Sequence, residues 1–254
     1  MKVTFLGTGT SCGVPSIGCC CEVCTSKDPH DSRLRCSILV ETDTTRVLVD
    51  CGPDFRQQIM PQPFRRINAL LLTHSHYDHV GGLDDIRPYC RFGPIQIYAN
   101  DVAASMLRRN MPYCFAQDKY PGVPSLVLHE ITPHESFKVG DVDIMPIEVM
   151  HDMMPILGYR MGDFVYITDM KSINDSEMPY LGGVDTLVVN ALRFHPSHHS
   201  HQTVEDAIQF ARRVGARQTY LIHPSHDIGL HEVVNTQLLP SDIQLAYDGQ
   251  ILNL

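Results

Sequence analysis

The segment NALLLTHSHYDHVGG, residues 68–82, limits the possible folds of this chain more than any other. Its apolar run predicts a buried strand, and four side chains of the metal-ligand type follow that run within six positions: His74, His76, Asp78 and His79. Burying such a polar loop is costly unless its groups have partners, and a divalent cation is a suitable partner. Side chains two residues apart on an extended backbone point the same way, so His74 and His76 are expected to share one ion. Asp78 and His79 can then turn toward a second ion, which predicts a fold that holds two metals at a strand end.

Three more candidate ligands end predicted strands farther along the chain: His151 closes DIMPIEVMH, Asp169 closes FVYITD and His223 closes TYLIH. With the loop residues they make five His and two Asp, enough for two ions with one carboxylate available to bridge them. Two ions roughly 3.5–4 Å apart activate a shared water and polarise the bond under attack, so hydrolysis is the natural chemistry. A ligand set of nitrogen and oxygen suits Zn²⁺, Mn²⁺ or Fe²⁺ and does not select one of them.

Many strand-like runs with helices between them predict an α/β (α+β) fold, in which two sheets pack face to face with helices outside. The candidate strands are VTFLG, SILVE, RVLVD, NALLLT and IQIYA in the first half and DVDIMPIEVM, GYRM, FVYITD, TLVVNA, TYLIH and IQLAY in the second. Helices are expected at 54–60, 101–109 and 202–214. Thr203 is expected to cap the last helix, with Asp206 three residues on. We expect one domain over 1–254; within it, the Pro-rich segment 110–125 is either a surface connection or a loop overhanging a pocket.

Charge and composition limit the partners and the compartment. The formal net charge of −9 argues against a broad basic surface, so no stable nucleic-acid binding is expected. No apolar run approaches the roughly 18 residues of a membrane span, so no membrane association is expected. The N-terminal residues MKVTFLGTGTSCG lack the long apolar stretch of a secretory signal, which predicts a cytoplasmic protein. In that reducing compartment the nine cysteines are not expected to form a disulfide framework.

A cysteine cluster, IGCCCEVC at residues 17–24, instead predicts a metal site or a catalytic site. Three of its members have a C-x-C-x-x-C spacing: Cys19, Cys21 and Cys24. Cys20 is expected to point elsewhere. His226, three residues beyond His223, is the candidate fourth ligand, and a Cys₃His tetrahedron is a closed structural zinc site. Free buried thiols are the alternative.

The HxHxDH element, followed by separated His, Asp and His at strand ends, resembles the metallo-β-lactamase superfamily. The resemblance implies a four-layer αββα sandwich with metals at one end, between the two sheets. It assigns one ion to His74, His76 and His151 and the other to Asp78, His79 and His223, with Asp169 as the bridge. GTGTSCGVPSIGC, THSHYDHVGGL and IHPSH further resemble the PhnP-like phosphodiesterases, in which a structural zinc accompanies the dinuclear site. That resemblance implies a structural zinc in the loop around 19–24, held by Cys19, Cys21, Cys24 and His226, which attaches the loop to the active-site wall.

The segment RFHPSHHSHQT, residues 193–203, offers several histidines just before a predicted helix. A solvated polar loop accounts for three of them: His195, His198 and His199. The PhnP-like pattern places an active-site histidine at His201, which would protonate the leaving alkoxide or steady the phosphoryl oxygens. This segment differs in composition from the family, so which of the four histidines assists is left open. Arg87 and Arg193 are expected to be surface or packing residues rather than phosphate contacts, and isolated histidines are expected to be ordinary: His129, His134 and His231.

These patterns imply a metal-dependent hydrolase, most simply a phosphodiesterase acting on a small phosphate ester, cyclic esters included. Two Zn or Mn ions would serve the active site, with one structural Zn, and Asp78 and His201 would be the catalytic side chains. A tRNA 3′-processing nuclease is the first alternative, although no Lys/Arg-rich insertion is visible; a hydrolase of non-phosphate esters or thioesters is the second. A non-enzymatic zinc protein would have lost ligands. β-Lactam hydrolysis is disfavoured because Asp78 followed by His79 resembles the phosphodiesterase and glyoxalase-like branches of the superfamily more than the lactamase branches. A homodimer is left open.

Overall fold

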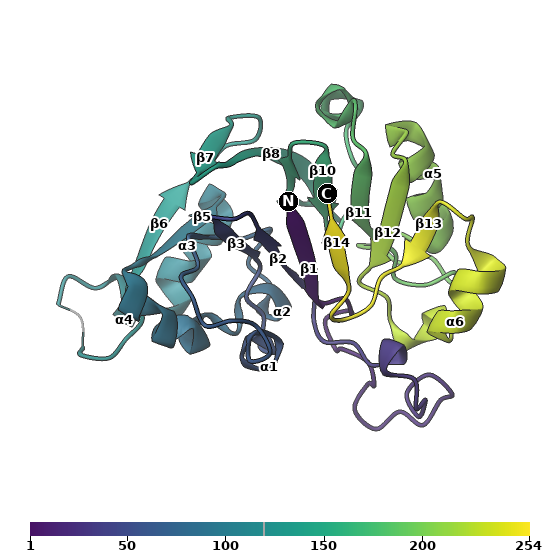
Figure 1. The fold of residues 1–254 in the computed structure, drawn as a ribbon, viewed down its shortest axis with the longest axis horizontal. Coiled ribbons are helices and arrows are strands. Elements are labelled where there is room, and N and C mark those ends of the chain that lie inside the picture. The colour runs from purple at the N-terminus through teal and green to yellow at the C-terminus, as the bar shows by residue number, and fades with distance from the viewer. Residues whose placement is uncertain (119) are drawn as a thin grey trace.

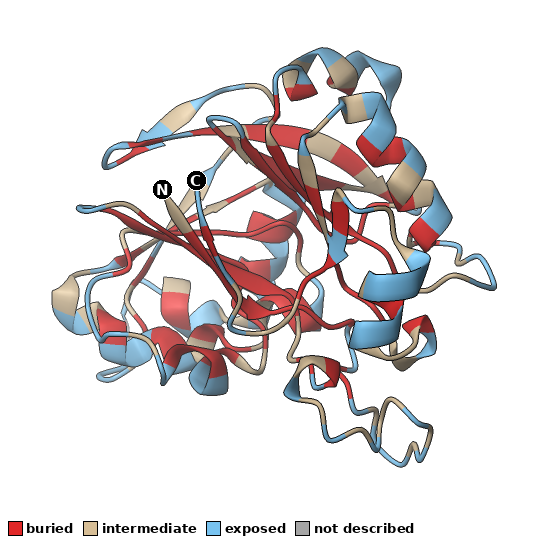
Figure 2. Cartoon of the chain, turned by 45° about the vertical axis from the view of Figure 1, so that its right-hand side comes forward, coloured by how far each residue is buried: buried red, intermediate tan, exposed pale blue. Residues whose placement is uncertain are grey.

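The computed structural model describes residues 1–118 and 120–254 and contains two seven-stranded sheets packed face to face (Figure 1). The first sheet has the order β14-β1-β2-β3-β4-β5-β6, and the second has the order β13-β12-β11-β10-β9-β8-β7. Helices cover the outer face of each sheet (Figure 2), so the predicted αββα sandwich is confirmed. Among the described residues no helix is long and apolar enough to cross a bilayer.

The first sheet consists of β1 (Lys2–Gly7), β2 (Ser37–Glu41), β3 (Arg46–Val49), β4 (Ala69–Leu71), β5 (Ile95–Ala99), β6 (Leu126–Glu130) and β14 (Ile251–Asn253). The second consists of β7 (Phe137–Val139), β8 (Val142–His151), β9 (Met154–Met161), β10 (Phe164–Ile167), β11 (Thr186–Asn190), β12 (Gln218–Ile222) and β13 (Ile243–Leu245). The α-helices are α1 (Phe55–Ile59), α2 (Tyr77–Val80), α3 (Asp101–Asn110), α4 (Pro112–Phe115), α5 (Val204–Val214) and α6 (His231–Val233). The other helical segments are η1 (Pro29–Asp31), η2 (Leu83–Phe92), η3 (Asp175–Leu181), η4 (His226–Ile228) and η5 (Val234–Leu238).

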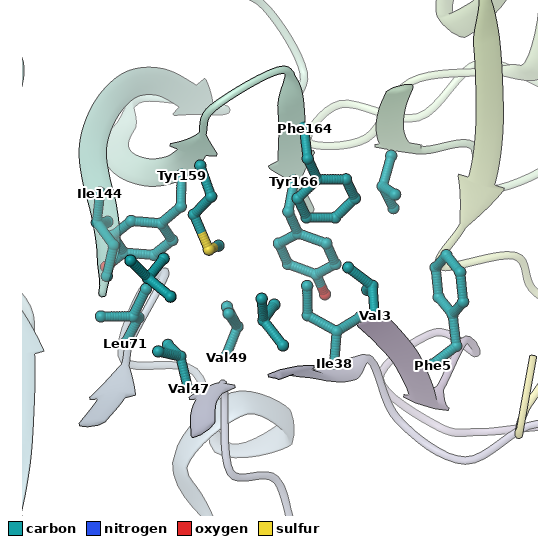
Figure 3. Close-up of a cluster of buried hydrophobic side chains, with 14 of the residues drawn as sticks. Val3, Phe5, Ile38, Val47, Val49, Leu71, Ile144, Tyr159, Phe164 and Tyr166 are labelled. Carbon is teal, nitrogen blue, oxygen red and sulfur yellow. The ribbon is translucent and has the colours of Figure 1, made fainter. Parts of the chain in front are cut away.

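The core between the sheets is apolar because successive side chains of a strand point to opposite faces, and the inward set of each sheet is hydrophobic. Tyr159 and Tyr166 of the second sheet are fully buried and face Val47, Val49 and Leu71 of the first (Figure 3). Two further apolar layers lie under the helices on the outer faces, one beneath α1, η2 and α3 and one beneath α5. The strands are therefore buried on both sides, as the red bands of Figure 2 show.

Parallel strands bring their carboxyl ends together at one end of the sandwich. In the first sheet β3, β4, β5 and β6 pair in parallel, and in the second β10, β11, β12 and β13 do so. The segments that leave β4, β10 and β12 therefore emerge where the two sheets meet. These segments carry His74, Asp169 and His223.

Helices α1, α3 and α5 occupy the ranges expected from the sequence, and Thr203 and Asp206 form a reciprocal capping box at α5. The short strands β6, β7 and β14 and the ten-residue turn helix η2 were not foreseen. The segment 110–125 contains α4, and its residue 119 lies outside the described part of the chain.

Candidate metal centre

The seven side chains expected to hold the two ions lie together at this end of the sandwich. Each of two groups places its ligand atoms within 4.8 Å of one another. The first group is His74, His76 and His151, and the second is Asp78, His79, Asp169 and His223. Residues up to 149 positions apart in the chain (223 − 74 = 149) thus form one cluster.

Asp169 lies between the two groups. Its Oδ2 is 3.9 Å from His74 Nε2 and 3.3 Å from His223 Nε2, and its Oδ1 is 3.4 Å from His79 Nε2. A single carboxylate therefore reaches nitrogens assigned to both ions. This is the placement that a bridging ligand needs.

One observation that does not depend on the sequence motif indicates that these His and Asp side chains suit divalent cations. The Nε2 atoms of His74, His79 and His223 are buried and make no hydrogen bond within the described structure. Buried polar atoms in native proteins nearly always have a partner. Imidazole nitrogens that converge on carboxylate oxygens without bonding to one another leave a space that suits a cation.

His74, His79 and His151 each have a partner for Nδ1, whereas neither ring nitrogen of His223 has a hydrogen-bond partner in the described structure. His151 Nδ1 lies 2.9 Å from the carbonyl oxygen of Ser200, which can only accept, so Nδ1 carries the hydrogen and Nε2 is left as the ligand. His74 Nδ1 lies 3.0 Å from Thr73 Oγ1. Outer contacts of this kind set the tautomer and the orientation of a metal-binding imidazole.

Asp50 holds His79 in the same way, and the sequence analysis missed it. Its carboxylate is fully buried, lies 2.7 Å from His79 Nδ1, and accepts hydrogen bonds from the backbone N–H and the hydroxyl of Thr73 at 2.9 and 2.8 Å. Asp50 closes the predicted strand RVLVD as Asp169 closes FVYITD. The same signal, a polar residue at the end of a predicted strand, pointed to the candidate ligands and would have identified Asp50 as well.

Three residues of the centre adopt a left-handed backbone. The φ angles of Asp50, Asp169 and His223 are 61°, 58° and 60°. Residues other than glycine rarely adopt this region, and such strain concentrates at functional sites. The backbone bends sharply at each of these strand ends, which aims the side chain between the sheets.

Burial and neighbouring charges shift the pKa values of two histidines of the centre. Burial alone lowers the pKa of His79, but the carboxylates of Asp169, Asp50 and Asp78 outweigh burial and hold it well above its ordinary value. Burial, reinforced by the neighbouring His79, lowers the pKa of His74 well below its ordinary value. The surrounding carboxylates therefore favour positive charge at this position.

His201 is the one histidine of the 193–203 segment that the structure places against the centre. Its ring centroid is 4.8 Å from that of His151 and 4.7 Å from that of His223. Burial, followed by the nearby His223, lowers the pKa of His201 to about 3. His195 and His199 are exposed, whereas the half-buried His198 ring lies 5.1 Å from His201. Burial and the neighbouring imidazoles therefore favour the neutral form of the His201 ring.

The cysteine cluster is also assembled as the spacing suggests. The ligand atoms of Cys19, Cys21, Cys24 and His226 all lie within 4.8 Å of one another, with His226 Nδ1 at 3.5 Å from Cys19 Sγ and 3.3 Å from Cys21 Sγ. A zinc–thiolate tetrahedron with bonds of about 2.3 Å has edges of about 3.8 Å, so these separations fit zinc. The backbone N–H of Cys24 and the His226 ring lower the pKa of Cys21 to about 6, which favours the thiolate. Cys20 is exposed and outside the group.

The two arginines considered above have different surroundings. Arg87 forms an exposed ion pair with Asp84, as expected of a surface residue. Arg193 pairs with Asp227 at 3.2 Å and lines a cavity together with His201.

The fold agrees with comparisons to known proteins. A family model described as the beta-lactamase superfamily domain matches residues 45–224. The crystal structure of a new diphosphatase from the PhnP family is 41% identical, covers 99% of this chain and 96% of that chain, and superposes with a TM-score of 0.91. Zn²⁺-bound PqqB from Methylobacterium extorquens (TM-score 0.75, 19% identity, 100% of both chains) and the short form of human tRNase Z (TM-score 0.74, 21% identity, 100% of this chain and 99% of that chain) share the fold.

A curated relative named octanoyltransferase, from Porphyromonas gingivalis, is 43% identical over 250 residues, which is 98% of this chain and 51% of that protein. The chain thus spans about half the length of that relative. The family model covers most of the chain, and the PhnP-family structure covers nearly all of it. The chain therefore belongs to the β-lactamase superfamily and, within it, to the PhnP family.

Proposed function

We propose that this chain is a dinuclear metal-dependent hydrolase of the phosphodiesterase type, acting on a small phosphate ester, cyclic esters included. The observation that carries the proposal is the position of Asp169, within 4 Å of nitrogens from both ligand groups. A shared carboxylate of this kind is typical of two-metal sites that hydrolyse phosphate esters. The diphosphatase activity named for the 41% identical PhnP-family relative supports phosphorus as the reacting atom.

The metal assignments follow from the two ligand groups. His74, His76 and His151 would hold one ion, Asp78, His79 and His223 the other, and Asp169 would contact both. When bound, Zn²⁺ or Mn²⁺ would lower the pKa of the attacking water and offset charge on the phosphoryl oxygens. The Cys₃His group would hold a separate structural zinc that takes no part in the chemistry.

The protein's own side chains orient the reactants. Asp78 directs Oδ2 toward His79 at 3.1 Å and His223 at 3.8 Å, which leaves Oδ1 to accept a hydrogen bond from the attacking water. His201 Nδ1 is buried without a hydrogen-bond partner in the described structure, so the neutral ring has capacity to steady a phosphoryl or leaving oxygen. The water oxygen bonds to phosphorus as one of its protons passes by way of Asp78 Oδ1 to solvent, one P–O bond breaks, and the leaving oxygen takes up a proton from solvent.

Other activities have weaker support. The likeness to tRNase Z at 21% identity concerns the fold, and the net charge of −9 disfavours long RNA. Octanoyl transfer is named for a relative of which only 51% is matched, so its transferase activity can belong to the unmatched half. The Cys19, Cys21 and Cys24 thiols form no disulfide, which supports a reducing, cytoplasmic setting.

A substrate panel tests the proposal. Metal-loaded protein should hydrolyse bis(4-nitrophenyl) phosphate, 2′,3′-cyclic nucleotides or a dinucleoside diphosphate, and the His76→Ala variant should lose this activity. His129→Ala is the matched control, because that imidazole binds Gln96 at 2.8 Å and is not in either ligand group. Protein that cleaves a thioester, a lactone or an octanoyl ester while leaving every phosphodiester intact would overturn the proposal, and efficient processing of precursor tRNA would redirect it.

A further inference from the structure

The loop that carries the cysteine cluster has no apolar core of its own. It spans residues 15–32 and projects from the sandwich as the purple loop at the bottom of Figure 1. No residue in the range 15–30 is buried, and Ile17 is fully exposed. Two backbone hydrogen bonds between Val14 and Arg33, at 2.9 and 2.7 Å, close the loop at its base. Changes within the loop therefore need not disturb the sheets.

The cysteine-bearing part of the loop contacts a distant segment of the chain through His226. The Nδ1 atom of His226 lies 3.5 Å from Cys19 Sγ and 3.3 Å from Cys21 Sγ. Within the loop, the backbone N–H of Cys24 donates to Cys21 Sγ at 3.5 Å, and the backbone N–H of Ser16 donates to Cys24 Sγ at 3.4 Å. Because no side chain here is buried, zinc bound to the four ligand atoms is what would hold this part of the loop in shape.

Cys20 is an additional thiol in the same loop. All nine cysteines lie in the described part of the chain, and only Cys12 and Cys20 are exposed. The three candidate ligand cysteines are half-buried, and Cys20 is outside their group, so a zinc ion would leave the Cys20 thiol unbound. An accessible thiol beside other thiols that can form a disulfide with it is typical of an oxidation-sensitive site.

Covalent geometry selects the disulfide partner of Cys20. Consecutive Cα atoms lie about 3.8 Å apart, whereas the Cα atoms of a disulfide are usually about 4.4–6.8 Å apart. Cys19 and Cys21 are the sequence neighbours of Cys20 and are therefore poor partners. Cys24 lies four residues farther on, in a loop that can rearrange because it has no buried side chain. Cys24 is thus the ligand thiol that can bond to Cys20 with the least strain.

We propose that Cys20 is an oxidation site, at which hydrogen peroxide converts Cys20 and Cys24 to a disulfide and releases the structural zinc of the Cys₃His group. The Cys20 thiolate attacks one peroxide oxygen, the O–O bond breaks, and Cys20 becomes a sulfenic acid as hydroxide leaves. The Cys24 thiolate then attacks the Cys20 sulfur, so that an S–S bond forms and the S–O bond breaks with loss of a second hydroxide. The two thiols lose two electrons in total, and the peroxide is reduced to two molecules of water.

The disulfide removes one of the four zinc ligands, which weakens zinc binding and frees His226. His226 lies three residues beyond His223, a candidate ligand of the metal centre. Loss of the loop zinc would therefore loosen the segment that carries this ligand. Oxidation of the loop needs the Cys₃His group and is independent of the phosphodiesterase activity.

Peroxide treatment of protein with zinc in the loop and Mn²⁺ at the metal centre tests the oxidation site. Elemental analysis after desalting measures the two metals separately, and peptide mass spectrometry locates the disulfide. Wild-type protein should lose its tightly bound zinc as a Cys20–Cys24 disulfide forms, and a thiol reductant with added zinc should reverse both changes. Cys20→Ala should keep its zinc over the time in which the wild type loses it.

Cys12→Ala is the matched control, because it removes the other exposed thiol and leaves the loop cysteines intact. This variant should lose zinc at the wild-type rate. Equal zinc release by Cys20→Ala and the wild type, or a disulfide between Cys21 and Cys24 with Cys20 unchanged, would overturn the oxidation site. Wild-type protein that holds no zinc before treatment would refute the release step. Failure of the phosphodiester panel refutes the proposed function alone and leaves these outcomes unaltered.

Discussion

Asp50→Asn replaces one buried carboxylate with an amide of nearly the same shape, at the residue that holds the His79 imidazole. Asp50 Oδ2 receives the 2.7 Å contact from His79 Nδ1 and a 2.8 Å hydrogen bond from the Thr73 hydroxyl, and Oδ1 accepts the 2.9 Å bond from the Thr73 backbone. The amide keeps one acceptor atom and presents an N–H₂ group to at least one of these donors. A charge-assisted hydrogen bond is lost and a buried donor is left without a partner.

The expected cost follows from these contacts. Losing a hydrogen bond to a charged group costs about 1.5–3 kcal/mol, which corresponds to roughly 10- to 150-fold in an equilibrium constant. Outer partners of metal-binding histidines are typically worth about 10- to 100-fold in metal affinity. We therefore expect Asp50→Asn to weaken the affinity for the metal held by His79 by about 10- to 100-fold, measured by competition with a chelator of known affinity.

Glu177→Gln is the matched control for this experiment. Glu177 is also buried and lies 2.7 Å from an imidazole nitrogen, His134 Nε2, but His134 belongs to neither ligand group. The control should lower the melting temperature without changing metal affinity. The reasoning is refuted if Asp50→Asn binds metal as tightly as the wild type, or if both variants lose the same affinity.

Three further predictions concern the surroundings of the centre. Thr8→Val should lower metal affinity, because it removes a hydroxyl that donates to Asp248 at 2.7 Å and accepts from Arg33 at 2.8 Å, and these contacts hold the backbone whose carbonyl accepts from His223 N–H at 2.7 Å. Thr8→Ser should rescue, and Thr4→Val, which removes a buried hydroxyl without a partner in the described structure, should not weaken binding. Cys21→Ala should lose a tightly bound zinc, seen by elemental analysis, and lower the melting temperature before activity falls, whereas Cys20→Ala should do neither. Burial and the nearby Arg33 lower the pKa of His231 from 6.5 to about 4, so the unfolded chain binds more protons between these values and the free energy of unfolding should rise with pH across that window. After allowance for the partial exposure of His231, the gain in the free energy of unfolding across this window is ~2 kcal/mol at most. His231→Asn should reduce the dependence of this free energy on pH, measured by urea titrations at several pH values. An unchanged pH dependence would show that His231 is not the group involved.

The proximity of the seven candidate ligands could be predicted largely from sequence, because each is either a close neighbour of another or the last residue of a strand-like run. His74, His76, Asp78 and His79 lie in one loop, so their proximity needs no knowledge of the fold. His151, Asp169 and His223 end apolar runs, and strands that run in parallel bring their ends together. The αββα layers followed from the same runs together with the family resemblance.

Other features depend on tertiary contacts that no local pattern records. The choice of His201 over its neighbours depends on the path of the segment 193–203, which is set by backbone bonds such as Leu192 N–H to Gln202 and by the contact of Ser200 with His151. The strands β6, β7 and β14 are short and partly exposed, so their apolar signal is weak.

The central claim is that folding gathers these side chains around two neighbouring cations. Anomalous X-ray diffraction from a crystal soaked in manganese salt tests it most directly. The account predicts two peaks roughly 3.5–4 Å apart, one contacting His74, His76 and His151 and the other contacting Asp78, His79 and His223, with the Asp169 carboxylate reaching both. A single peak, no peak, or Asp169 turned away from both positions would contradict it.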